Sequence, residues 1–163
     1  MDKQRIALLQ NMPVFGGIRD DMLEFLLSLS KSITVKSGDS FFRENDSGGS
    51  FFVLESGMVA VTKLWKGHQH VLRQLEKGDC FGEMAIMDMQ LRSASVIAMQ
   101  DSSAIEIPVS CLYQMQKKDL KQFTLIQMNM GREVSRRLRE LDDELFRINI
   151  EGSGKLGDLY RHT

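Results

Sequence analysis

Residues 50–62 read SFFVLESGMVAVT, in which two runs of β-branched and aromatic residues lie on either side of Ser56-Gly57. Such runs around a turn signal predict two antiparallel strands. Similar turn signals recur at intervals of 9 to 11 residues, and their glycines are Gly38, Gly48, Gly57, Gly67 and Gly78. Further short runs of the same type are Ile33–Val35, His70–Leu72, Arg92–Ala98 and Ser103–Ile107. Short strands at this even spacing predict an antiparallel sandwich or roll.

The chain has helical character on both sides of this region. Lys3–Gln10 and Asp20–Leu29 predict two short helices, and Lys117–Ile150 contains no proline and only one glycine, which predicts a long one. The expected fold class is therefore α+β, an antiparallel β-roll of the jelly-roll type flanked by N-terminal helices and a long C-terminal helix. We expect the helices and roll in residues 1–117, the long helix in 118–150 and a flexible tail in 151–163.

The composition is that of a soluble globular protein of about one domain. Of the 163 residues, 42% are hydrophobic and 26% are charged, and the formal net charge is −1. No global positive field exists to attract nucleic acid or an anionic membrane. The charged start is followed by no long apolar run, which argues against a secretory signal or a membrane span. Cys80 and Cys111 lack CxxC spacing, so we expect reduced thiols in a cytoplasmic protein.

Residues 79–98, which read DCFGEMAIMDMQLRSASVIA, contain the residues best suited to binding. Gly82 allows a close backbone approach, and the first N–H groups of a helical turn at Glu83–Met87 can receive an anion. The guanidinium of Arg92 can bind a phosphate through two hydrogen bonds. Glu83 would be repelled by a phosphate and suits a sugar hydroxyl. The alternative is a plain corner of the roll, with Glu83 favoured by the helix dipole and Arg92 exposed.

The pattern Phe-Gly-Glu-x-Ala, then Arg-Ser-Ala, then Val-x-Ala resembles the phosphate-binding cassette of the cyclic nucleotide-binding domain family. This family includes the effector domain of the catabolite activator protein and the regulatory subunits of cyclic-nucleotide-dependent kinases. The resemblance runs from about Met12 to Leu141. It includes Val14-Phe15, Ser37-Gly38-Asp39, residues 52–57 and Lys77-Gly78-Asp79.

The resemblance implies that the ligand is cAMP or cGMP. Glu83, with the carbonyl of Gly82, would hold the ribose 2′-hydroxyl, and Arg92 would pair with the cyclic phosphate. The amides of Ala85 and Ser93 would complete the phosphate cradle. A hydroxyl residue at the position of Ser93 occurs with both cyclic nucleotides, so it does not decide between them.

The resemblance also implies a base pocket. Val61 and Leu75 would line it, and Arg73 is an unusual charge for its wall. The full set of residues implied in nucleotide binding is Phe81, Gly82, Glu83, Met84, Ala85, Arg92, Ser93, Ala94, Val61, Arg73, Leu75 and Arg137.

The long helix departs from the family pattern. Arg136-Arg137-Leu138 matches a short sequence of the bacterial activators, which is followed in them by hydroxyl residues that cap adenine. In this chain Leu141 and Asp142 stand at the capping positions. Asp142 can accept from an exocyclic amine of either purine. Arg137 can reach Glu83 and couple the helix to the site, and the alternative is an exposed charge.

An apolar heptad repeat follows one side of this helix and predicts a parallel homodimer. Its members, which we call the seam, are Gly131, Val134, Leu138, Leu141, Leu145 and Ile148. In a parallel pair, Arg137 of one copy would face Asp142 of the other. The alternative is a helix folded back onto its own roll.

These features predict a stand-alone regulatory module without enzymatic activity, whose change on binding is read by an unknown protein partner. The 13 residues after Ile150 are too few for a DNA-reading module, so no nucleic-acid partner is expected. One alternative is a degenerate scaffold that dimerises without binding a nucleotide. Another is a cupin-like metalloenzyme that uses His68 and His70, but Gln74 stands where a glutamate ligand would follow. We therefore expect no metal site and an exposed hairpin tip at His68 and His70.

Overall fold

The computed structural model describes residues 3–152 and contains two four-stranded antiparallel sheets that face each other as a roll. One sheet has the order β1-β8-β3-β6 and the other β2-β7-β4-β5. The strands are β1 (Lys31–Val35), β2 (Ser40–Phe42), β3 (Ser50–Ser56), β4 (Met58–Trp65), β5 (His68–Glu76), β6 (Cys80–Phe81), β7 (Ser95–Ala98) and β8 (Ser102–Pro108). The expected α+β roll is confirmed.

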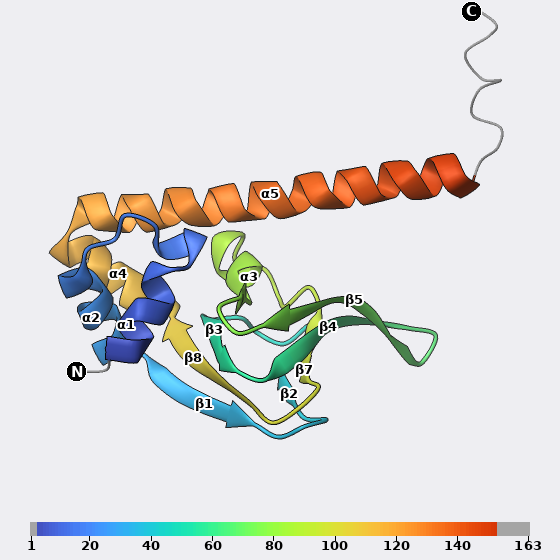
Figure 1. Ribbon diagram of the computed structural model, residues 1–163, viewed down its shortest axis with the longest axis horizontal. Coiled ribbons are helices and arrows are strands. Elements are labelled where there is room, and N and C mark those ends of the chain that lie inside the picture. Colours follow the sequence, from blue (N-terminus) through green and yellow to red (C-terminus); the bar gives the residue numbers. More distant parts are fainter. Residues whose placement is uncertain (1–2, 153–163) are drawn as a thin grey trace, which may run out of the picture.

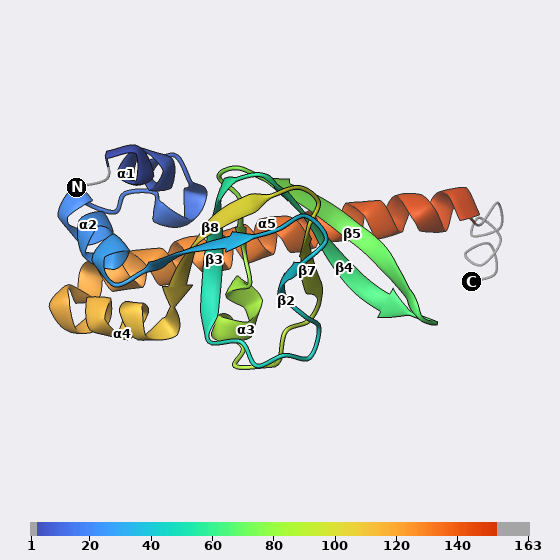
Figure 2. The same cartoon turned by 90° about the horizontal axis from the view of Figure 1, so that it is seen from below.

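The helices gather at one end of the roll and along one side of it (Figure 1). The helical segments are α1 (Lys3–Gln10), the short 3-10 helix η1 (Pro13–Phe15), α2 (Asp20–Ser28), α3 (Glu83–Met87), α4 (Val109–Lys118) and α5 (Leu120–Gly152). Figures 1 and 2 show α1, α2 and α4 beside the ends of β1 and β8, while α5 crosses the whole roll with α3 beneath it. No helix within residues 3–152 is long and apolar enough to cross a membrane.

Strand β3 is buried on both faces because it separates two hydrophobic clusters. Its alternate residues Phe51 and Val53 pack against the helical end, together with Phe15 and Met115. The residues between them pack inside the roll, in a cluster formed by Phe52, Leu54, Val59, Leu75, Phe81, Val96 and Ala104. The rings of Phe52 and Phe81 stack there with centroids 5.2 Å apart. Phe81 directly precedes Gly82, so this aromatic cluster lies next to the residues that the resemblance implies in binding.

The first half of α5 belongs to the helical end of the same molecule. Ile126 and Met130 join the cluster around Phe15. The amide nitrogen of Asn129 donates to the carbonyl oxygens of Val14 and Gly16, at 3.1 and 2.9 Å. The helix is thus anchored at its N-terminal half, and its direction over the roll is fixed.

Three local expectations were wrong. The helix predicted from Lys117 is broken at Asp119, which has extended backbone (φ −152°), and its Oδ1 accepts from the amide of Gln122 at 3.1 Å. The strand predicted from Arg92 begins only at Ser95. Helix α5 continues to Gly152, two residues into the predicted tail, and the remainder of that tail lies outside the described residues.

Candidate functional site

Arg92 lies in the loop between α3 and β7, where its backbone is held by the loop between β2 and β3. The amide of Arg92 donates to the carbonyl of Asp46 at 2.9 Å, and the carbonyl of Arg92 accepts from the amide of Asn45 at 2.9 Å. These bonds explain why β7 begins later than predicted, because Arg92 pairs with this loop rather than with a strand. The loop therefore fixes where the Arg92 side chain enters the roll.

The Arg92 side chain is an almost completely buried cation, with 4% of its surface exposed. Its Nη1 donates to the carbonyl of Gly82 at 2.8 Å, and its Nη2 donates to the carbonyl of Ser50 at 2.7 Å. The guanidinium carbon lies 4.0 Å from the ring centre of Phe42. Burial lowers the pKa of Arg92 from its ordinary value, but a guanidinium keeps its charge at any physiological pH.

The guanidinium of Arg92 lacks one hydrogen-bond acceptor and a counter-charge. Its Nε is buried and has no hydrogen-bond partner, and no carboxylate of residues 3–152 lies within ion-pair distance of it. A buried charge without a counter-charge is unfavourable, as is a buried donor without an acceptor. The arrangement is therefore suited to receive an anion.

A cavity opens beside Arg92. Its lining consists of Phe42, Val61, Arg73, Phe81, Gly82, Glu83, Met84, Ala85, Arg92, Ser93, Ala94 and Val96. It thus brings together all the residues implied in binding except Leu75 and Arg137. The walls are mostly apolar, and the charged groups are confined to Arg92, Glu83 and Arg73.

Leu75 is not a lining residue, contrary to expectation. It lies on the same side of β5 as Arg73, but it pairs with Val59 deep in the roll and packs within the aromatic cluster. Phe42 and Val96 line the cavity instead, and neither was predicted. Phe42 follows another phenylalanine, so no alternation of polar and apolar residues indicates which way its side chain points.

Glu83 is buried at the start of α3, directly after Gly82. Gly82 has a left-handed backbone (φ +82°), and a Cβ there would lie only 2.6 Å from Nη1 of Arg92. Nη1 of Arg137 on α5 donates to Oε1 of Glu83, and Nη2 of Arg137 donates to the carbonyl of Cys80 at 2.9 Å. The expected contact between Arg137 and Glu83 is present. Arg137 holds the helix to the cassette from outside the cavity rather than lining it.

Each partner of the ion pair between Arg137 and Glu83 makes a further contact that holds it in place. Oε1 of Glu133 lies 3.2 Å from Nε of Arg137. Sγ of Cys80 donates to Oε2 of Glu83 at 3.8 Å. Burial, followed by the charge of Glu83, raises the pKa of the Cys80 thiol well above its usual value, so the thiol stays protonated and can donate. The carboxylate of Glu83 is thus held in one orientation.

Arg73 on β5 is a second guanidinium facing the cavity. Its side chain is half-buried and makes no hydrogen bond or ion pair with any of residues 3–152, although its backbone pairs with Val61 of β4. Burial, and then the positive charge of Arg137, lower its pKa from the ordinary value. Its donors are free to contact a ligand.

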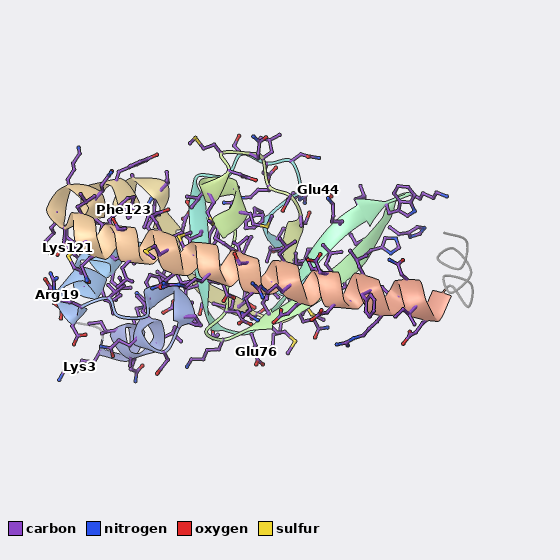
Figure 3. All side chains as sticks on the ribbon, turned by 90° about the horizontal axis from the view of Figure 1, so that it is seen from above. Lys3, Arg19, Glu44, Glu76, Lys121 and Phe123 are labelled. Carbon is purple, nitrogen blue, oxygen red and sulfur yellow. The ribbon has the colours of Figure 1, made fainter. Side chains whose placement is uncertain are left out.

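The hairpin tip has the exposed form that was expected. His68 and His70 are both exposed on β5, opposite Trp65 and Lys63. Figure 3, which looks onto α5, shows this hairpin extending from the roll, with Glu44 and Glu76 on opposite sides of the helix. Within the described residues no group of three or more histidine, cysteine, aspartate or glutamate side chains is placed to hold a metal ion.

A profile of the cyclic nucleotide-binding domain family matches residues 32–119, which is more than half of the chain. The match covers most of the roll, including the cassette with Gly82, Glu83 and Arg92. The chain belongs to the cyclic nucleotide-binding domain family.

Individual relatives include both kinases and bacterial proteins. The chain is 33% identical over 105 residues to cGMP-dependent protein kinase 2 of Homo sapiens, covering 63% of the chain and 14% of the kinase. It is 27% identical over 144 residues to the cyclic AMP receptor protein of Thermus thermophilus, covering 88% of the chain and 65% of the receptor. The chain therefore spans less than two thirds of the length of either protein.

The crystal structure of a cyclic nucleotide-binding domain from Methylobacillus flagellatus KT has the same fold. It superposes with a TM-score of 0.78 at 21% identity, over 94% of this chain and 85% of that one. The agreement includes the long C-terminal part of this chain, beyond the residues that the family profile matches.

The buried pair between Arg137 and Glu83 predicts a large stability effect. Arg137→Ala leaves a carboxylate that is only 3% exposed without its counter-charge, which costs about 3–5 kcal/mol in the free energy of unfolding by urea. Arg136→Ala is the matched control, because that side chain is 56% exposed and its ion pairs contribute about 1 kcal/mol or less. Equal effects of the two substitutions would show that the Arg137 contact does not hold α5.

Proposed function

We propose that this chain is a cytoplasmic regulatory module that binds cAMP or cGMP in the cavity beside Arg92, without catalysing a reaction. The observation that carries this proposal is the buried guanidinium of Arg92, whose Nε has no partner. A cyclic nucleotide supplies the missing anion through its single phosphate charge. The family membership supports the same ligand class.

The other polar groups of the cavity fit the rest of such a ligand. Glu83 accepts from the ribose 2′-hydroxyl, which stands on the carbon next to one of the two that bear the cyclic phosphate. Val61 and Val96 provide apolar contact for the base. A purely apolar ligand would leave Arg92 unsatisfied, and a ligand with several phosphates would meet the negative charge of Glu83.

Arg73 supports cGMP over cAMP. Arginine can donate two parallel hydrogen bonds to N7 and O6 of guanine, whereas adenine presents an amine in place of O6. The free donors of Arg73 face the cavity, so a guanine base satisfies them and an adenine base does so only in part. Ser93 is exposed at the edge of the cavity and does not oppose either base.

Helix α5 is the element through which binding would be transmitted. The carboxylate of Glu83 contacts Arg137 on α5 and would also contact the ligand, so the two contacts are coupled. A ligand shifts the position of α5 by as much as its affinities for the two arrangements differ. A downstream protein of unknown identity would recognise the change.

The seam on α5 supports a parallel homodimer. In the single chain Leu138, Leu141, Leu145 and Ile148 are each 56–57% exposed, on the half of the helix that extends past the helical end. A second copy of the same helix covers them by two-fold symmetry. Arg137 faces the roll and is paired with Glu83 and Glu133, so it is not free to meet Asp142 of a second copy as expected. The seam alone carries this part of the proposal.

The central test is calorimetric titration of the chain with cAMP and with cGMP. Arg92→Ala removes one partner of a buried charge pair, which costs about 2–5 kcal/mol of binding free energy, or at least about thirtyfold in affinity. Arg43→Ala, at an exposed arginine of the neighbouring loop, should bind as the parent does. A folded parent chain that binds neither nucleotide would instead be the degenerate scaffold.

Arg73→Ala tests the choice of base. If Arg73 contacts N7 and O6, its loss reduces the preference for cGMP over cAMP by about 1–3 kcal/mol, which is about fivefold to 150-fold. Gln74→Ala is the matched control, because Gln74 is the next residue of β5 and is exposed. An unchanged ratio of the two affinities in Arg73→Ala would exclude a contact between Arg73 and the base.

Sedimentation velocity tests the dimer. We expect the chain to sediment as a dimer at tens of micromolar, and Leu141→Asp to sediment as a monomer because two carboxylates would face each other in the seam. A parent chain that is monomeric at that concentration would contradict the dimer without affecting the proposed ligand.

A further inference from the structure

The loop between β2 and β3 packs against Arg92, although its residues do not line the cavity. Besides its backbone bonds to Arg92, it is tied to the roll by the amide of Glu44, which donates to Oγ of Ser95 at 2.9 Å. Oδ2 of Asp46 accepts from the amide of Arg43 at 2.9 Å, which closes the loop on itself. The loop is therefore fixed at its start, and at Gly48 its backbone passes close to the guanidinium of Arg92.

Gly48 is the residue of this loop that touches the binding cassette. A Cβ at Gly48 would lie 2.5 Å from Cβ of Ala85, 3.1 Å from Nε of Arg92 and 3.2 Å from Cζ of Arg92. The backbone of Gly48 is not left-handed, so space rather than conformation requires a glycine here. At Gly49, the next residue, a Cβ would meet no atom within 4 Å.

We propose that Gly48 is a positioning residue for the phosphate site, which sets the place of the Arg92 guanidinium and of α3 through Ala85. This inference rests on the proposed function for its ligand. It adds to that function a contact between three parts of the chain: the loop between β2 and β3, helix α3 and the segment before β7.

The neighbours of Gly48 have little freedom to yield. Arg92 is tied by its two Nη atoms to the carbonyls of Gly82 and Ser50, and Phe42 covers one face of its guanidinium. Ala85 is 5% exposed and belongs to α3, which begins at Glu83. A methyl group at residue 48 must displace α3, the guanidinium or the loop itself. Each of these movements changes the distance between the groups that would hold the phosphate and the ribose.

The matched pair Gly48→Ala and Gly49→Ala tests this inference by calorimetric titration with cGMP and cAMP. We expect Gly48→Ala to bind at least about tenfold more weakly, which is the effect of modest overpacking in a filled site. Gly49→Ala should bind within about twofold of the parent, because its methyl group enters open space. Equal affinities of the two variants would overturn the positioning role, even if Gly48→Ala unfolds at lower urea.

A second substitution separates positioning from a general loss of stability. Ala85→Gly removes the methyl group that the new one would strike, while the contacts near 3.1 Å to Arg92 remain. We therefore expect Gly48→Ala to cost less affinity in the Ala85→Gly protein than in the parent, by about threefold or more. Losses that are the same in the two backgrounds would overturn the inference. If Gly48→Ala alone does not fold, the affinity of the double variant is compared with that of Ala85→Gly. A loss of about threefold or less supports positioning through Ala85, and a greater loss overturns it.

Binding by the parent chain separates a failure of the proposed function from a failure of the inference about Gly48. A parent that binds neither nucleotide contradicts the proposed function and the role of Gly48 together. A parent that binds, with a Gly48→Ala variant that binds equally well, contradicts only the inference about Gly48.

Discussion

The burial of one guanidinium, that of Arg92, is the constraint on which the rest of the site depends. Its charge is removed from water and is met only by the carbonyls of Gly82 and Ser50, with Phe42 against its face. The backbone passes close to this guanidinium at two points, where a Cβ would lie 3.1 Å from Nε and 2.6 Å from Nη1, which accounts for the glycines at positions 48 and 82. The structure thus maintains a positive charge with an unused donor beside a cavity, an arrangement that is unfavourable until an anion arrives.

A second buried interaction connects this cavity to the long helix. Glu83 directly follows Gly82, whose carbonyl accepts from Arg92, and the carboxylate of Glu83 pairs with Arg137 of α5. Because Asn129 anchors the first half of α5 to the helical end, the contact at Arg137 decides the position of the half that carries the exposed seam. The ion pair between Glu83 and Arg137 thus links the cassette to the half of α5 that carries the exposed seam.

Sequence patterns predicted most of the fold because they act locally. The alternation in residues 50–56 places Phe51 and Phe52 on opposite faces of β3, and the evenly spaced glycines mark the turns between strands. Asp119 is a local signal too, because an aspartate that accepts from the amide three residues later caps the start of a helix and marks the break between α4 and α5. The errors within the site concern residues whose neighbours are distant in sequence. Leu75, which we expect in the cavity, lies in the core, while Phe42 and Gly48 meet Arg92 only once the roll has closed.

The most direct test of the account is a crystal structure of the chain grown with the cyclic nucleotide that it binds more tightly. We predict a phosphate oxygen within about 2.7–3.2 Å of a guanidinium nitrogen of Arg92. The Nε of Arg92, which has no partner in the unliganded chain, would donate to the phosphate or to an ordered water. We also predict the ribose hydroxyl against Glu83. A nucleotide bound elsewhere, or one bound in the cavity with its phosphate away from Arg92, would contradict the account.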